Sequence, residues 1–224
     1  MTSVDEPIRP DGRVRDAART KAEILDMATR EFARAGYEGA RVEEIAARTR
    51  TTKRMIYYYF GGKEQLFTAV LERAYGALRE AERRLDVAHL DPVAAIRRLA
   101  ELIFDHHERH PDYIRLLSIE NLQCAEDPAP SGRLDAIGSP ALDVLREILA
   151  AGRESGVFRA DVDALDLHAV ISSFCFFRAV NRRAFGVLFG RDLVDPDRRE
   201  HYRVMLGDMV IGYLTTEGAG APVR

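Results

Sequence analysis

The segment TRTTKRMIYYYF, residues 49–60, concentrates cations and aromatic rings in a chain whose formal net charge is -3. It contains three basic residues and four aromatic rings. Lysine and arginine attract phosphates, and tyrosine hydroxyls bond phosphate oxygens while their rings pack on sugars and thymine methyl groups. The chemistry of this segment favours contact with duplex DNA. A charged face that is merely solvated is the alternative interpretation.

The charge of the whole chain is unevenly distributed. Residues 9–63 contain 13 Lys and Arg against 8 Asp and Glu, whereas residues 64–224 contain 20 against 26. A basic N-terminal quarter on an acidic remainder indicates that only one end meets a polyanion. Chance variation in solvated charge would give a similar asymmetry.

A helix over residues 53–60 would separate these side chains onto two faces. Ile56, Tyr59 and Phe60 fall on one face, which predicts that they pack inward. The free N–H groups at the helix start favour an anion, and Arg54 is placed there to reach guanine O6 and N7. The side chains predicted to contact DNA are Thr51, Thr52, Lys53, Arg54, Met55, Tyr57, Tyr58 and Lys63.

Helical periodicity runs through the rest of the chain and predicts an all-α fold. Thr20 and Glu23 have the spacing of a capping box, which predicts a first helix from Thr20 that Gly36 ends. Thr52 is the expected cap of the third helix. Residues 1–18 are expected to form a flexible basic arm, 125–140 a loop and 216–224 a flexible tail. Helices are expected over 20–36, 42–48, 53–60, 63–85, from 92, from 111, and over roughly 141–154, 163–189 and 197–215.

Composition argues against secretion, membrane insertion and a disulfide framework. Two cysteines, Cys124 and Cys175, suit a reducing compartment, and no apolar stretch typical of a signal peptide opens the chain. The most apolar run, residues 169–180, is interrupted by polar residues and is too short to cross a bilayer. We therefore expect a cytoplasmic protein with no membrane partner.

Residues 20–71 resemble the N-terminal domain of the tetracycline-repressor (TetR) family of bacterial transcriptional regulators. The resemblance is carried by AGYEGA, then IAAR, then a K-x-x-I-Y-x-Y-F string followed by G-K-E-x-L-F. It implies a three-helix DNA-binding domain over residues 19–65, with a helix-turn-helix at about 41–60. It also implies a helical ligand-binding and dimerisation domain over residues 66–215. Lys53, Tyr57 and Tyr58 would contact bases or backbone, and Lys63 would contact a phosphate.

The chain departs from the pattern of that family at three positions. Arg50 stands in the turn where Gly is common, so the turn needs a conformation that Arg adopts at some strain. Arg41 stands where Thr often caps the second helix, which loses a cap and adds a possible phosphate contact. Arg54 replaces a frequent Gly, so the base preference of relatives does not transfer.

The last two helices favour dimerisation. The final helix carries an apolar stripe, and the preceding helix is apolar nearly all round. If these two helices paired with the same helices of a second copy, they would form a four-helix interface. The dimer would then present two recognition helices about one DNA turn apart, to a pseudo-palindromic site. Packing within a monomer core is the alternative. The predicted interface residues are Phe176, Tyr202, Met205, Leu206, Met209 and Tyr213.

The C-terminal helices also predict a largely apolar pocket for an unidentified small-molecule effector. Arg178 lies on an apolar helix, so it needs an anionic partner. That partner is either a ligand carboxylate or Glu120, and the internal pair is favoured slightly. The predicted pocket residues are Phe104, His107, Tyr113, Leu117, Asn121, Phe174, Phe177, Arg178 and Asn181.

The stretch DHHERH, residues 105–110, raises the question of a metal. His106 and His110 have i, i+4 spacing, but the H-E-x-x-H pattern of metalloproteases is absent. Because Pro111 follows, an exposed helix end is the favoured interpretation. An all-α metalloenzyme that uses His106, His107 and His110 is the rival, and an architectural DNA-binding protein without a ligand is a third possibility. We expect no catalytic residues, metal or cofactor, and a ligand-responsive, dimeric repressor.

Overall fold

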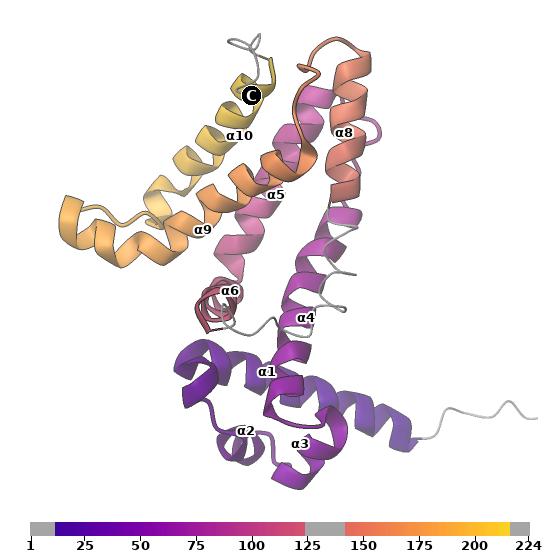
Figure 1. The fold of residues 1–224 in the computed structure, drawn as a ribbon, viewed down its shortest axis with the longest axis vertical. Coiled ribbons are helices and arrows are strands. Elements are labelled where there is room, and N and C mark those ends of the chain that lie inside the picture. The colour runs from indigo at the N-terminus through magenta and orange to yellow at the C-terminus, as the bar shows by residue number, and fades with distance from the viewer. Residues whose placement is uncertain (1–11, 124–141, 216–224) are drawn as a thin grey trace, which may run out of the picture. The chain divides into compact units, whose positions relative to one another are not determined.

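The computed structural model describes residues 12–123 and 142–215, and in these ranges all the regular elements are helices (Figure 1). The all-α prediction is therefore confirmed. The expected loop at 125–140, the tail at 216–224 and residues 1–11 of the expected arm lie outside the described residues. None of the described helices combines the length and apolarity needed to cross a membrane.

The chain divides into two compact units, with the boundary between Leu71 and Glu72. The first unit packs three helices and the start of a fourth around a small core. Phe32, Ile45, Ile56 and Leu66 are completely buried in it, and the rings of Phe32 and Phe67 meet edge to face at 4.9 Å. Its elements are α1 (Gly12–Gly39), α2 (Val42–Arg48), α3 (Lys53–Phe60) and the first part of α4 (Lys63–Arg83).

Helix α1 begins earlier than the capping pattern predicted. The hydroxyl of Thr20 donates to the carbonyl oxygen of Asp16 at 2.7 Å, and Glu23 pairs with Arg19 at 2.9 Å. The predicted capping box is therefore wrong, because both side chains interact inside a continuous helix. Residues 12–18, expected in the flexible arm, are helical. Gly36 does interrupt the helix, with φ 74° and ψ 174°, before a last turn that ends at Gly39.

The second unit is built around α5, which packs against α8, α9 and α10. Asp91 and Asp163 cap α5 and α9 by accepting hydrogen bonds from backbone N–H groups, as their side chains favour. Pro92 and Pro111 begin α5 and α6, as the sequence predicted. The elements are the rest of α4, α5 (Pro92–Arg109), α6 (Pro111–Gln123), α8 (Asp143–Glu154), α9 (Ala164–Phe189), the short 3-10 helix η2 (Pro196–Arg198) and α10 (Arg199–Thr215).

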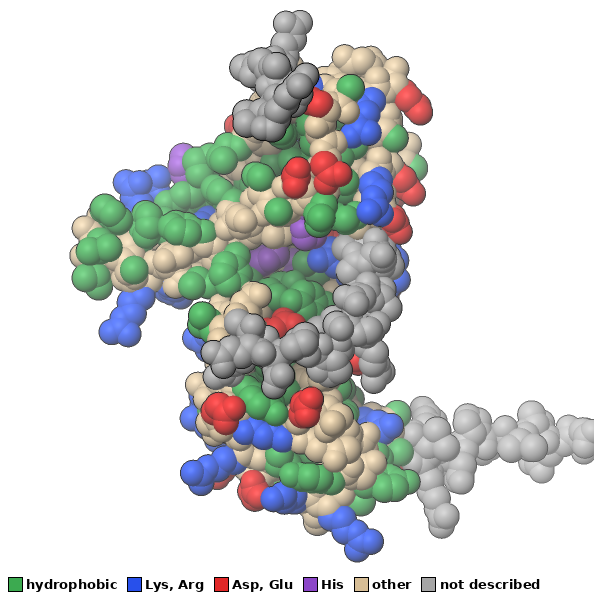
Figure 2. All heavy atoms as spheres, viewed as in Figure 1, with side chains coloured by type: hydrophobic (Ala, Val, Ile, Leu, Met, Phe, Trp, Pro, Cys, Tyr) green, Lys and Arg blue, Asp and Glu red, His purple; other side chains and the backbone are tan. Residues whose placement is uncertain are grey.

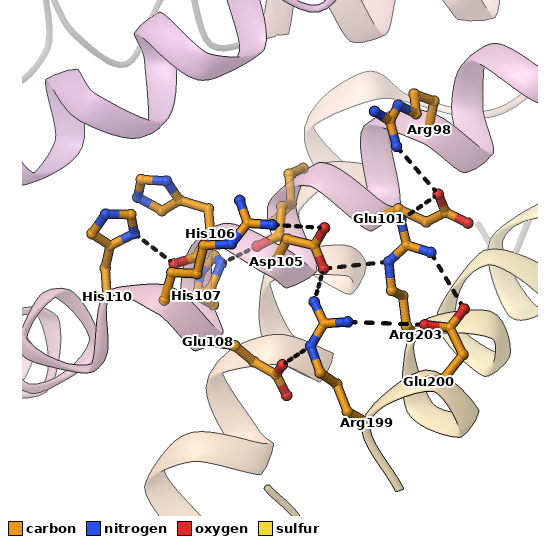
Figure 3. A network of polar contacts seen from close by, with 12 residues as sticks. Arg98, Glu101, Asp105, His106, His107, Glu108, His110, Arg199, Glu200 and Arg203 are labelled. Carbon is orange, nitrogen blue, oxygen red and sulfur yellow. Dashed lines mark hydrogen bonds and ion pairs between the residues drawn. The ribbon is translucent and has the colours of Figure 1, made fainter. Parts of the chain in front are cut away.

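Ion pairs join α5 to α10 (Figure 3). Arg203 donates to Glu101 at 2.8 Å and to Asp105 at 3.3 Å. Arg199 pairs with Asp105 and, at 2.8 Å, with Glu108. The acidic residues recur on one side of α5, so the α5–α10 contact is fixed by charge as well as by the apolar core. Figure 3 shows His106 and His110 on the other side of Asp105 from Arg199 and Arg203.

Candidate nucleic-acid interface and effector region

Helix α3 has the bounds that the sequence predicted. The hydroxyl of Thr52 accepts a hydrogen bond from the N–H group of Met55 at 3.2 Å, and Gly61 ends the helix with φ 93°. Ile56 is completely buried, whereas Tyr58 is 78% exposed and Tyr57 is 42% exposed. Burial of one face therefore fixes which side chains α3 presents to solvent.

Lys53 is held by helix α2 as well as by its own helix. Its ammonium group lies 2.5 Å from a carboxylate oxygen of Glu43 and 5.6 Å from the ring centroid of Tyr57. The hydrogen bond between Lys53 and Glu43 raises the pKa of the lysine and lowers that of the glutamate. Because an ammonium group has three donors, Lys53 can keep Glu43 and still bind a phosphate oxygen.

The arginines of this unit differ in how they are engaged. Arg34 and Arg48 pair with the buried Glu31, at 2.8 Å and 3.9 Å. In contrast, the exposed side chains of Arg41, Arg50 and Arg54 form no ion pair within the described residues. These three guanidinium groups are therefore available to an external anion.

Two of the arginines occupy the unusual positions that the sequence indicated. Arg50 has φ 52°, the left-handed conformation that favours glycine. Arg41 precedes α2 as its N-cap residue and makes no side-chain capping bond. The structure thus shows one departure from the family pattern in the backbone conformation of Arg50 and the other in the missing side-chain cap at Arg41.

Lys63 has a structural contact that the sequence did not indicate. Its ammonium group donates to the carbonyl oxygen of Glu38 at 3.1 Å and lies 4.9 Å from the ring centroid of Tyr37. Lys63 therefore ties the start of α4 to the end of α1, with donors left for a phosphate. Tyr59 is half-buried and packs under Lys21, in agreement with its predicted inward orientation.

The predicted DNA-binding residues otherwise gather on and beside the exposed side of α3. Thr51 is half-buried at the turn before α3, and Met55 is at the margin between the exposed and buried faces. We call the exposed set the α3 face. It consists of Thr52, Lys53, Arg54, Met55, Tyr57 and Tyr58.

In the second unit, Arg178 is buried and fully engaged by internal partners. It donates to Glu108 at 2.9 Å and to the carbonyl oxygen of Leu193 at 3.1 and 2.9 Å. The prediction of an internal partner is correct but the prediction of Glu120 is wrong, because Glu120 on α6 accepts instead from the hydroxyl of Tyr75 at 2.9 Å. Arg178 therefore already has an internal anionic partner and does not need a ligand carboxylate to balance its charge.

The other predicted pocket residues are dispersed. Phe104 is completely buried beneath the guanidinium of Arg178, at 4.3 Å. Phe177 is exposed and packs on Phe185, and the amide of Asn181 donates to the carbonyl oxygen of Phe177. Asn121 is exposed, whereas Leu117 and Phe174 pack against the core. His107 and Tyr113 form a separate pair, with ring centroids 5.4 Å apart.

His107 and Tyr113 belong to a group of buried and half-buried polar side chains that the sequence pattern did not predict to lie together. Arg79 pairs with Glu82 at 2.5 Å, and both of its terminal nitrogens lie 3.4 Å from His168 Nε2. One signal in the sequence points to this group, because Glu82 interrupts the apolar stripe between Leu78 and Leu85. We call this group the buried polar cluster. It consists of Arg79 and Glu82 from α4, His106 and His107 from α5, Tyr113 from α6 and His168 from α9.

Burial dominates the acid–base properties of the cluster. It lowers the pKa of His106 and of His168 to about 4 in each case, and that of His107 as well. It also raises the pKa of Tyr113 to about 12. All four groups are therefore neutral near pH 7.

The histidines of residues 105–110 are not the exposed helix end that the sequence predicted. His106 and His107 are buried because α4 and α6 cover this end of α5, and only His110 is exposed. The rings of His106 and His110 stack at 4.2 Å. In the described part of the chain, no group of three or more His, Cys, Asp or Glu side chains is arranged to hold a metal.

The predicted dimer residues divide into core and surface. Tyr202 is 7% exposed and Leu206 is 1% exposed, because this side of α10 packs on α5. Their assignment to an interface is therefore corrected, and Phe176 and Met205 also pack against the core. Met209 and Tyr213 are exposed on α10, and Figure 2 shows hydrophobic side chains gathered toward the end of α9. The exposed stripe of α9 includes Val170, Phe177, Val180 and Val187.

Comparison with protein-family models matches both units. Residues 24–70 match the model described as bacterial regulatory proteins, tetR family. Residues 92–210 match the model described as tetracyclin repressor-like, C-terminal domain. The first match spans the α3 face, and the second spans most of the second unit.

Individual relatives extend these matches over most of the chain. The HTH-type transcriptional repressor NicS of Pseudomonas putida is 35% identical over 199 residues, which cover 89% of this chain and 94% of NicS. The HTH-type transcriptional repressor SCO4008 of Streptomyces coelicolor is 36% identical over 159 residues, 68% of this chain and 74% of that protein. The crystal structure of the S. coelicolor transcriptional regulator SCO4942 is similar with a TM-score of 0.64 and 32% identity, covering 85% of this chain and 97% of that one. The protein therefore belongs to the TetR family of bacterial transcriptional regulators.

Proposed function

We propose that this regulator is a homodimeric repressor that binds a pseudo-palindromic DNA operator through α3 and is released by a small molecule. One observation carries the proposal. Helix α3 is fixed by the buried Ile56 and the capping Thr52, and it presents cations and tyrosine rings on its exposed side. This combination supplies phosphate contacts, base contacts and a rigid support for both. No catalytic role, metal or cofactor is part of the proposal.

The direction of regulation is argued from relatives. NicS and SCO4008 are both named transcriptional repressors. Repression follows physically if the operator overlaps a promoter, because a bound dimer then excludes polymerase. Release requires an effector whose affinity differs between the DNA-binding state and another state of the dimer.

Dimerisation is argued from the apolar surface of α9 and α10. Phe177, Val180, Met209 and Tyr213 are each about half exposed. A monomer would leave these apolar side chains in water, and exposed apolar patches mark protein interfaces. The interface that we propose therefore uses Met209 and Tyr213, which are exposed on α10, in place of the buried Tyr202 and Leu206.

The proposal is tested by operator affinity in Tyr58→Ala. Because Tyr58 is 78% exposed, its removal should leave the melting temperature unchanged. We expect operator affinity to fall by roughly tenfold, as for loss of about 1–2 kcal/mol of contact energy, measured by fluorescence anisotropy. Wild-type affinity should also fall about 10³–10⁵-fold between 50 and 200 mM salt, if 6–10 phosphates are contacted.

Arg146→Ala is the matched control for charge. This arginine is exposed on α8 and, among the described residues, pairs only with Asp143, so its loss should not alter operator affinity beyond a weak long-range effect. Arg54→Ala removes the same charge from α3 and should weaken binding. Unchanged affinity in both Tyr58→Ala and Arg54→Ala would overturn the assignment of α3.

A further inference from the structure

We propose that the effector is a small organic carboxylate whose anionic group binds in the buried polar cluster, to Arg79, His168 and Tyr113. The inference rests on the proposed function, in which the second unit binds a small molecule. It adds the chemical class of that molecule and the groups that recognise it.

The first observation is a set of polar atoms without protein partners on side chains that are nearly buried. The ring nitrogens of His106, Nε2 of His107 and the hydroxyl of Tyr113 form no hydrogen bond within the described residues, although each side chain is more than nine-tenths buried. Each of these atoms can still donate or accept a hydrogen bond. Together they offer hydrogen-bonding capacity that a ligand can use.

The second observation is that these groups, which lie on α5 and α6, face one another and retain some access to solvent. The ring centroid of Tyr113 lies 5.6 Å from that of His106 and 5.4 Å from that of His107. None of the unpaired ring nitrogens or the Tyr113 hydroxyl is completely sealed from solvent. Figure 2 shows histidine side chains at the base of a recess between α6 and α9.

The third observation is the sign of the local charge. The charged neighbours that act on His106, His107 and His168 are arginines and other histidines, and no described carboxylate contributes to the shift of their pKa values. Arg79 acts on all three. The charged group shared by these rings is therefore the guanidinium of Arg79, offset in part by its partner Glu82, so an anion is favoured over a cation beside them.

Arg79 has donors to spare for that anion. Its guanidinium uses Nη1 for Glu82, while Nη2 has only the 3.4 Å contact with His168. A guanidinium group offers five N–H donors in a fork that fits a carboxylate. The apolar body of the ligand would lie against Leu117, one turn after Tyr113 on the same side of α6.

Binding of an anion should be linked to proton uptake. The histidines are neutral at pH 7, and a carboxylate beside them favours the protonated form. The affinity for a carboxylate should therefore rise as pH falls from 8 to 6, by up to about tenfold per pH unit for each proton bound. The ionisable groups that act on the histidine rings are Arg79 on α4, Arg109 and His110 on α5, and the cluster histidines themselves, while Glu82 on α4 and Glu120 on α6 act on Tyr113.

The test compares carboxylates with their neutral amides. Full-length protein is titrated with benzoate and benzamide, phenylacetate and phenylacetamide, and hexanoate and hexanamide, each to about 10 mM, and the melting temperature is recorded. We expect at least one acid to raise the melting temperature more than its amide, with a larger difference at pH 6 than at pH 8. If no acid exceeds its amide, or if the amides bind better, the proposal is overturned.

Three variants locate the site. His168→Gln and the double variant Arg79→Met/Glu82→Leu should each reduce the preference for the acid by at least tenfold. The double variant removes both partners of a buried pair, which proteins tolerate better than loss of one. His201→Gln, an exposed histidine on α10, is the matched control and should keep the preference. Retention of the preference in both cluster variants would overturn the assignment.

Operator binding is measured separately, so the two proposals fail differently. An acid that binds the cluster but does not release DNA would contradict release by an effector and leave the carboxylate site standing. Failure of the wild-type protein to bind any operator would contradict the assignment of α3, while the acid–amide comparison would still decide the chemistry of the cluster.

Discussion

At the scale of single residues, the DNA-binding unit tolerates two arginines that lower its own stability. Arg50 adopts φ 52°, which costs about 1–2 kcal/mol for a residue other than glycine. Arg41 fills an N-cap position without supplying a cap. Both guanidinium groups remain without an ion pair among the described residues. We infer that these positions exchange stability for positive charge beside the α3 face.

Arg41→Thr tests this exchange. A threonine there can accept the N–H bond that Arg41 leaves unmade, so the free energy of unfolding should rise by about 1 kcal/mol. Operator affinity should fall, since a phosphate contact is lost. Chemical denaturation and anisotropy titration measure the two effects on the same sample. A variant that is less stable, or that binds the operator equally well, would contradict the inference.

Individual partners of charged residues were the least predictable feature. Arg178 was expected to need an anion, but Glu108 lies 70 positions away in sequence and only the α5–α9 packing brings the two together. His106 and His107 were expected at an exposed helix end because their local sequence ends a helix. Covering of that end by α4 and α6 is a tertiary effect with no local signal.

At the scale of elements, helix bounds were predictable where a cap and a glycine both marked them. Thr52 and Gly61 delimit α3 as expected, because each acts through the backbone beside it. The predicted start of α1 is wrong because a threonine hydroxyl can either cap the start of a helix or donate to a carbonyl oxygen in the previous turn. In α1 the hydroxyl of Thr20 donates to the previous turn of the same helix. The order of the helices in the second unit followed from Asp-Pro and Pro starts, whereas their packing did not.

Two glycines in helices should respond oppositely to alanine. In α8, a Cβ on Gly152 would lie 1.9 Å from Cδ2 of the buried Phe158, so Gly152→Ala should destabilise the protein by about 1–3 kcal/mol. In α4, a Cβ on Gly76 would meet nothing within 4 Å, so Gly76→Ala should stabilise by about 0.5–1 kcal/mol. Thermal unfolding decides both signs. If Gly152→Ala were neutral, close packing of Phe158 on α8 would be refuted.

At the scale of the whole molecule, the proposed function depends on two copies acting together. A dimer engages both half-sites, so its affinity exceeds that of one unit without any new contact. Charge is divided accordingly, with the basic excess in residues 9–63 and the acidic excess in the rest. The acidic second unit would be kept away from DNA by repulsion, which favours binding through α3 alone.

Val180→Glu should disrupt the proposed dimer. Val180 is 46% exposed on the α9 stripe, and a carboxylate there would face its copy across an apolar interface. We expect a monomer by size-exclusion chromatography with light scattering, and a loss of operator affinity of roughly 10²–10⁴-fold. Val157→Glu, at a valine of similar exposure (41%) outside the stripe, should remain a dimer. A dimeric Val180→Glu variant would refute this interface.

The central claim, that the α3 face reads a two-fold-related DNA site, is tested most directly by selection from a random duplex library. The wild-type protein should enrich an inverted repeat whose half-sites are centred about one helical turn apart. Tyr58→Ala and Arg54→Ala should lose or alter that repeat, while Arg146→Ala should enrich the same sequence as the wild type. Absence of any enriched repeat with the wild type, or the same repeat with all three variants, would contradict the account.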